Sequence, residues 1–254
     1  MMLAIALAAI AGAAIGSFLN VCIHRLPLGQ SIVWPGSACP TCKGAVAWYD
    51  NIPILSWLVL GARCRSCRAR ISIRYPIVEA LTSVMCAGAL WYYGPGALFL
   101  SRFVFGCALV VLFAIDLEHQ ILPNVITVPG IVAGLAVSPF VEPGWRSALM
   151  GALLGGGLLW LVSEAYFRLR SAEGLGFGDV KMLAMIGAFL GWRQVWVVLF
   201  LASISGAIIG VLVTAGRGRS VRTRLPFGTF LAIAAFVASL TGEGVLNWYL
   251  GLWG

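Results

Sequence analysis

The stretch VVLFAIDLEHQILPN (residues 110–124) carries an apolar run into an aspartate, Asp116, and then into a short polar turn. The stretch GLGFGDVKMLAMIGAF (residues 174–189) has the reverse order, because Asp179 follows a glycine-rich segment and opens an apolar run. A carboxylate at membrane depth is energetically costly, so such residues usually have a function. The two aspartates are therefore the first candidate functional residues.

The composition is that of a membrane protein. Of the 254 residues, 61% are hydrophobic and 10% are charged, and the mean hydropathy is +0.97. A spanning helix needs about 20 mostly apolar residues. We therefore predict an all-α polytopic membrane protein with about eight transmembrane helices, near residues 2–19, 77–93, 97–115, 122–140, 147–166, 179–192, 194–215 and 226–241.

Two features of these runs affect the count. Seven spans is the alternative, because the run 179–192 is short and the boundary at 141–147 is weak. The first run is expected to remain as a span rather than to be removed as a signal peptide, since no basic region precedes it.

The basic residues predict the orientation. Of 17 Lys and Arg, seven lie between the first two runs, three flank the connection between the fifth and sixth, and four lie between the last two. Only three lie on the opposite side. The positive-inside rule then places the N-terminus outside and both aspartates at the cytoplasmic face. This topology and anionic lipid account for the net charge of +8, so no nucleic-acid partner is expected.

The one sizeable polar insertion, residues 20–76, contains two C-x-x-C pairs separated by 21 residues. Four thiolates at this spacing are typical of a closed tetrahedral zinc site, and disulfides are disfavoured in a reducing cytoplasmic loop. We predict a structural Zn²⁺ bound by Cys39, Cys42, Cys64 and Cys67. The expected domains are a first span (1–19), a cytoplasmic zinc module (20–76) and a transmembrane catalytic domain (77–254).

Asp116 and Asp179 are predicted to reach a similar depth on the same side. Neighbouring carboxylates do not both ionise readily, so the pair would share a proton, one member activating water while the other protonates the leaving group. Such a dyad titrates as a unit, and which aspartate is the base stays open. The glycines Gly174, Gly176 and Gly178 leave room for an extended substrate beside Asp179. The alternative is a flexible linker with Asp179 as a helix N-cap.

The chain resembles the bifunctional type IV prepilin peptidases, which belong to the GxGD-type membrane aspartic proteases. The resemblance runs nearly end to end, and beyond the two cysteine pairs it rests on GSFLNV (16–21), HRLP (24–27), NIP (51–53), RYP (74–76) with Glu79, Asp116, GxGD (176–179) and PFG (226–228).

This resemblance implies a specific activity. Asp116 and Asp179 would be the catalytic pair, and prepilins or pseudopilins of type IV pilus and type II secretion systems would be cleaved after the last glycine of the leader, at the cytoplasmic face of the bacterial inner membrane. S-adenosyl-L-methionine would donate a methyl group to the new N-terminus; its binding site is unknown, since the sequence contains no Rossmann glycine fingerprint.

The chain departs from the family pattern at three places. Asn124 follows Pro123 where aspartate is frequent, Thr229 follows PFG where proline is common, and Ala62-Arg63 stands where Gly-Lys is frequent. We expect neither Asn124 nor Thr229 to touch the dyad. Two alternative functions remain: a peptidase whose zinc module is only a scaffold, and a proton-coupled transporter that uses the aspartates as a relay.

Overall fold

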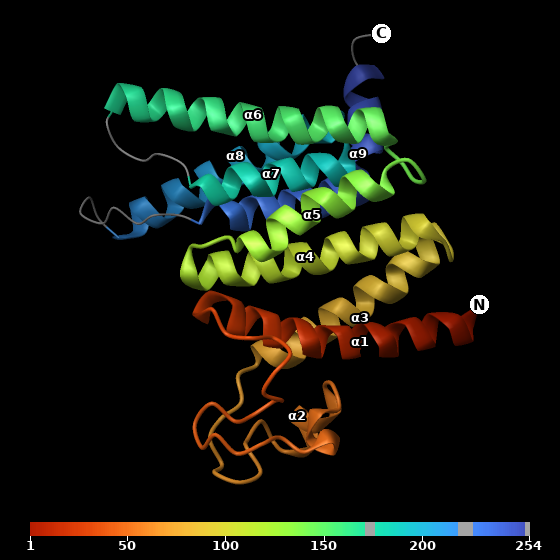
Figure 1. Cartoon of the computed structure of the whole chain (residues 1–254), viewed down its shortest axis with the longest axis vertical. Coiled ribbons are helices and arrows are strands. Elements are labelled where there is room, and N and C mark those ends of the chain that lie inside the picture. The colour runs from red at the N-terminus through yellow and green to blue at the C-terminus, as the bar shows by residue number, and fades with distance from the viewer. Residues whose placement is uncertain (171–175, 218–225, 252–254) are drawn as a thin grey trace. The chain divides into compact units, whose positions relative to one another are not determined.

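A computed structural model describes residues 1–170, 176–217 and 226–251, and these form a helical protein (Figure 1). The α-helices are α1 (Met2–Arg25), α2 (Leu55–Val59), α3 (Arg74–Tyr93), α4 (Ala97–His119), α5 (Asn124–Val137), α6 (Trp145–Arg170), α7 (Phe177–Leu190), α8 (Trp192–Arg217) and α9 (Phe227–Gly251). Two short 3₁₀ helices, Leu26–Leu28 and Trp48–Asn51, also occur. Within the described residues, extended pairing is limited to two isolated bridges.

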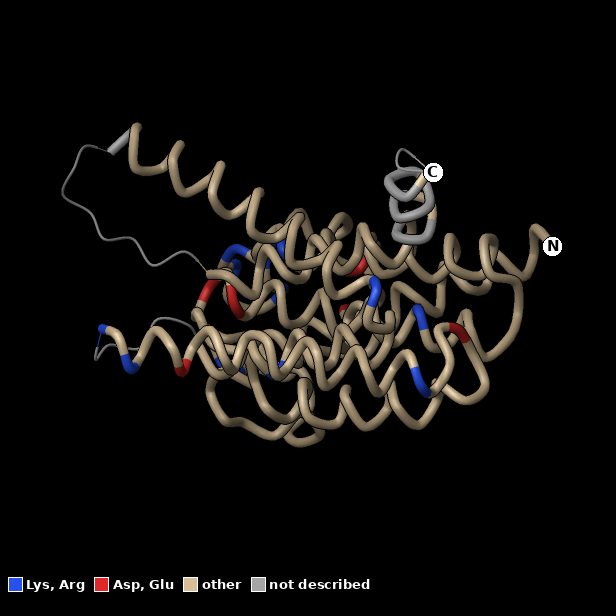
Figure 2. Tube along the Cα trace, turned by 90° about the horizontal axis from the view of Figure 1, so that it is seen from above, with Lys and Arg blue, Asp and Glu red and all other residues tan. Residues whose placement is uncertain are grey.

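The all-α class is confirmed, and a helix occupies each of the eight expected ranges. By length and composition, four helices can cross a membrane: Met2–Leu28, Ala97–His119, Trp145–Arg170 and Trp192–Ala215. Two further apolar helices, Asn124–Val137 and Phe227–Thr241, are shorter. Charged residues are sparse along the helices in Figure 2. The chain is therefore a helical membrane protein.

The chain divides into two compact units, Met1–Val111 and Leu112–Gly254. In the first unit, α1 and α3 pack in antiparallel directions with their backbones in close approach. A Cβ atom on Gly12 would lie 2.6 Å from the Thr82 carbonyl oxygen, and one on Gly16 would lie 2.7 Å from the Glu79 Cα. One turn further along, the Asn20 side chain donates a hydrogen bond to the Tyr75 carbonyl oxygen. These contacts fix the register of the two helices.

In the second unit, α7 is the central helix. Ten of its fourteen residues are buried, and it packs against α5, α6, α8 and α9. The contact with α6 is backbone to backbone, since a Cβ atom on either Gly151 or Gly187 would collide with the carbonyl oxygen of the other. The short apolar run that begins at Asp179 is thus a protein-enclosed core helix. The described part of this unit also contains both candidate aspartates.

Candidate active site and metal centre

Asp116 lies in the last turn of α4, and its side chain is directed at the start of α9. The residue is 5% exposed, and its Oδ2 accepts two hydrogen bonds from Thr229. The backbone N–H donates at 2.7 Å and the hydroxyl Oγ1 at 3.1 Å. Thr229 is in the first turn of its helix, where backbone N–H groups lack intrahelical partners. A carboxylate from one helix therefore satisfies a free donor of another.

Asp179 lies in the first turn of α7 and is 9% exposed. Its own N–H donates to the Gly176 carbonyl oxygen at 3.0 Å, which starts the helix. Gly178, which precedes Asp179, and Gly228, which lies beside the Asp116 carboxylate, both pack against Leu122, so the second unit brings the two acids into one region. Such a pair of buried carboxylates favours a single shared negative charge over two.

Leu122, which follows α4, packs against the first turns of both α7 and α9. A Cβ atom added to Gly178 would lie 2.8 Å from the Leu122 Cβ, and one added to Gly228 would lie 2.9 Å from its Cδ1. The same Gly228 Cβ would also lie 2.9 Å from the Asp116 Oδ2. Glycine at both positions is therefore required for this close packing around the acids.

The three glycines predicted to bind substrate differ in their positions. Gly174 lies outside the described residues. Gly176 has an extended backbone and is the N-cap of α7, whereas Gly178 already belongs to the helix. Their role in binding a substrate stays a prediction.

The expectation that Asn124 and Thr229 do not touch the dyad is wrong for Thr229, which bonds Asp116 twice. The Asn124 Oδ1 accepts a hydrogen bond from the Lys181 Nζ at 2.8 Å, two residues after Asp179. Sequence reasoning missed Thr229 because the contact joins residues 113 apart. The available signal was a hydroxyl residue in the first turn of a helix, a position that favours an acidic partner.

The four predicted cysteines come together in the first unit. Their sulfur atoms all lie within 4.8 Å of one another, which confirms the predicted cluster. The two knuckles repeat one pattern: the N–H of the first cysteine bonds the carbonyl oxygen five residues on, at Gly44 and Ala69. In each knuckle the residue four positions after that cysteine, Lys43 or Arg68, has a positive φ. Such paired turns are typical of tetrathiolate zinc sites.

The pKa values of two of the four cysteine thiols also indicate that this cluster favours a bound cation. The backbone N–H groups of Cys42 and Thr41 stabilise the thiolate of Cys39 and lower the pKa of this thiol to about 6. At Cys67 the Ala69 backbone lowers the pKa, but burial and the other three sulfurs outweigh it and raise the pKa to about 11. Four neighbouring sulfurs thus do not all ionise without a compensating positive charge. The donor set and its geometry fit Zn²⁺, which would bind to all four sulfurs.

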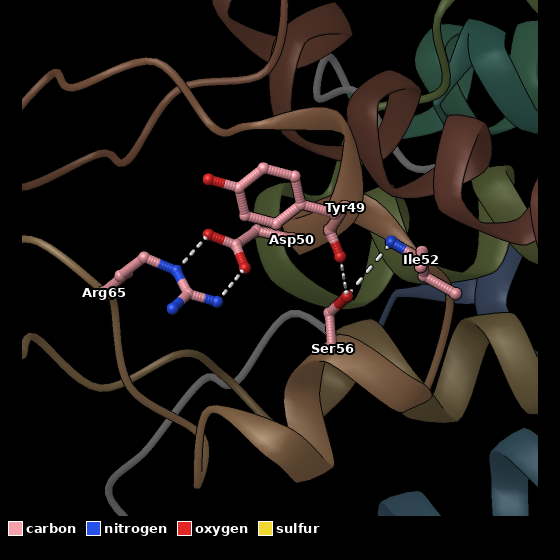
Figure 3. A network of polar contacts seen from close by, with 5 residues as sticks. All are labelled: Tyr49, Asp50, Ile52, Ser56 and Arg65. Atoms are coloured by element: carbon pink, nitrogen blue, oxygen red, sulfur yellow. Dashed lines mark hydrogen bonds and ion pairs between the residues drawn. The ribbon is translucent and has the colours of Figure 1, made fainter.

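The segment between the knuckles is held by polar contacts (Figure 3). Arg65 donates to both carboxylate oxygens of Asp50, at 2.7 and 2.5 Å, and its guanidinium lies over the Tyr49 ring. This ion pair lowers the pKa of Asp50. Ser56 donates to the Tyr49 carbonyl oxygen and accepts from the Ile52 N–H. These contacts link the second knuckle to the segment that follows the first.

One contact ties this segment to the helix pair of the same unit. Ile54 has a φ of +63°, a strained conformation for a β-branched residue, and its N–H donates to the buried Glu79 Oε2 at 2.7 Å. Glu79 comes from α3, directly opposite Gly16 of α1. The sequence did not predict this bond, although Glu79 was already among the motif residues.

Comparisons with known proteins agree with this site. Residues 10–93 match the Bacterial Peptidase A24 N-terminal domain, and residues 103–211 match the Type IV leader peptidase family. A protein of Aeromonas hydrophila named prepilin leader peptidase/N-methyltransferase is 38% identical over 263 residues, covering 93% of this chain and 90% of the relative. The chain belongs to the type IV leader peptidase family.

Other members of the family carry the same name. The relative from Myxococcus xanthus is 46% identical over 210 residues, which cover 82% of this chain and 63% of that protein. The relative from Pseudomonas aeruginosa is 36% identical over 267 residues, covering 94% of this chain and 91% of that protein. No solved structure matches the chain.

The boundaries of the family matches, of the compact units and of the predicted domains fall at different residues. The two family matches are separated by residues 94–102, and the compact units meet between Val111 and Leu112. The predicted zinc module, 20–76, lies within the first family match and the first unit. A functional boundary at residue 77 stays a prediction.

Proposed function

We propose that this protein is a membrane aspartic endopeptidase that removes the leader peptide of type IV prepilins or pseudopilins, and that it also N-methylates the new N-terminal residue. The observation that carries the peptidase part is the placement of Asp116 and Asp179, both buried, at the facing ends of helices in one compact unit. Membership of the leader peptidase family supports the substrate class.

The chemistry follows from two carboxyl groups that share one proton. The ionised carboxylate removes a proton from water as the water oxygen attacks the scissile carbonyl, and the protonated partner donates to the carbonyl oxygen. Proton return to the peptide nitrogen then breaks the C–N bond. The aspartates need no bound cofactor for these steps.

We place the catalytic face at the cytoplasmic side of the bacterial inner membrane. The support is the distribution of basic residues, which gather in the segments on the side that carries both aspartates. A prepilin has a polar leader followed by an apolar helix, so its scissile bond would lie at the same interface. Gly176 and Gly178 are the proposed lining of the substrate path, beside Asp179.

The methyl-transfer part rests on the first unit and on the names of the relatives. Zn²⁺ bound by Cys39, Cys42, Cys64 and Cys67 would fold the segment between α1 and α3, which has little apolar core of its own. S-adenosyl-L-methionine is the proposed methyl donor. A transporter offers no role for this four-cysteine module and is not supported.

The test is the mass of a processed pilin N-terminus. Asp116→Asn and Asp179→Asn are each expected to abolish cleavage while the protein still accumulates, because an amide neither activates water nor cycles a proton. The wild-type product should carry one added methyl group. Normal processing by either well-expressed variant would remove that aspartate from the mechanism, and cleavage without methylation would leave a peptidase with a structural zinc module.

A further inference from the structure

Asp116 and Asp179 differ in the donors that surround them. Asp116 accepts two hydrogen bonds on a single oxygen, from the N–H and the hydroxyl of Thr229. Asp179 has the backbone of Gly176 as its hydrogen-bonding neighbour. Asp179 lies in the first turn of α7, and the carboxylate of Asp116, which comes from the last turn of α4, reaches the first turn of α9. The difference between the two acids comes from Thr229.

Hydrogen bonds to a carboxylate stabilise its ionised form. Donors directed at Oδ2 also occupy that oxygen as an acceptor, which leaves the Asp116 Oδ1 free to take a proton. Asp116 needs such support, because the last turn of its own helix exposes carbonyl oxygens that disfavour a negative charge. Thr229 thus compensates an unfavourable location and orients one oxygen at the same time.

We propose that Thr229 is a positioning residue that makes Asp116 the ionised member of the dyad and its Oδ1 the general base. This inference rests on the proposed peptidase function. Asp116 Oδ1 takes the proton of the attacking water, while Asp179 gives its proton to the carbonyl oxygen. In the second half, Asp116 gives its proton to the leaving nitrogen as the C–N bond breaks, and Asp179 recovers a proton from the tetrahedral intermediate. Both acids then regain their starting states.

The other charged side chains near Asp116 have partners other than its carboxylate. Glu118 and His119 lie at the exposed end of α4 and contact each other. Lys181 of α7 is engaged by Asn124, and the sequence of α5 contains no titratable side chain. Among the residues that the structure describes, Asp179 is therefore the main titratable partner, and Thr229 is the residue that makes the pair unequal. A proline at position 229, as is common in the family pattern, would offer neither donor.

The experiment measures leader cleavage by the purified full-length protein against pH, with kcat and KM at each point. Thr229→Val keeps the N–H but removes the hydroxyl, so the acid limb of the profile should move up by about one pH unit, the effect of one hydrogen bond to a charged group. Thr229→Pro removes both donors at a position where a helix tolerates proline and should shift the limb further. Thr229→Ser should restore the wild-type profile.

A matched control lies in the same helix. Thr241 is exposed and its hydroxyl donates to the Val237 carbonyl oxygen of the same helix, so Thr241→Val should leave the profile unmoved. The direction of the change decides the assignment: loss of donors to the general acid would move the basic limb instead. Movement of the basic limb, or no movement in Thr229→Val and Thr229→Pro, overturns the inference while the peptidase function stands. A wild-type protein that cleaves no prepilin overturns both.

Discussion

Gly228→Ala tests whether the close packing at the start of α9 sets the position of the reacting carboxylate. The added Cβ would lie 2.9 Å from the Asp116 Oδ2 and 2.9 Å from the Leu122 Cδ1, whereas ordinary contact begins at 3.4 Å. Asp116 must therefore move by about half an ångström. Since a misplacement of about 1 Å costs roughly 100-fold in rate, we expect about a tenfold loss of kcat.

The effect on stability should be modest. Overpacking a well-packed site lowers the free energy of unfolding by about 1–3 kcal/mol, whereas replacing glycine by alanine inside a helix raises it by up to about 1 kcal/mol. The variant should therefore remain folded, and its loss of activity should exceed its loss of stability. Both quantities are measured on the same detergent-solubilised protein, by initial rates of prepilin cleavage and by thermal unfolding.

Two further variants isolate the cause. Gly244 lies in the same helix, and a Cβ added there would meet nothing within 4 Å, so Gly244→Ala should keep full activity. Adding Leu122→Ala to Gly228→Ala removes the contact with Cδ1 but not the contact with the carboxylate. Recovery in this double variant would assign the defect to Leu122. Full activity in Gly228→Ala alone would refute the reasoning, because the carboxylate would then tolerate displacement.

Three other predictions concern the zinc module and the glycines. Purified protein should hold about one Zn²⁺ per chain, and replacing Cys39 and Cys67 by serine should release it; elemental analysis that finds unchanged zinc would contradict the site. Gly178→Val should reduce cleavage severely because its Cβ would lie 2.8 Å from that of Leu122. A normal cleavage rate at matched protein levels would show that Leu122 can move aside without displacing Asp179. Glu79→Ala should leave the Ile54 N–H unpaired and lower the stability of the module by about 1–3 kcal/mol, whereas Glu79→Gln keeps an acceptor; equal protease resistance of the two variants would count against this bond.

Most of the correct predictions came from local sequence patterns. Apolar runs located eight of the helices, because a helix that spans a bilayer or lies in a protein core needs a run of mostly apolar residues. The spacing of the cysteines located the four-cysteine cluster, because each knuckle is one turn of chain and offers two sulfur atoms. The two aspartates were found because a carboxylate beside an apolar run is unusual in itself.

The contacts that distinguish the two aspartates were not predictable in the same way. Thr229 meets Asp116 across 113 residues, and no local pattern pairs the end of one helix with the start of another. The bond between Glu79 and Ile54 joins a helix to a strained loop residue, which depends on how the intervening knuckles fold. In both cases the partner was visible in the sequence, but the pairing required the tertiary structure.

The contact between Gly151 and Gly187 has a consequence for how this protein can diverge. Because the two backbones touch, α7 cannot slide along α6 without a collision, and Asp179 lies about two turns, roughly 12 Å, from that contact on the same rigid helix. The depth of the acid is therefore set by helix packing and not by the length of the connecting segment before it. Changes in the length of that connection can therefore accumulate during evolution without changing the depth of Asp179.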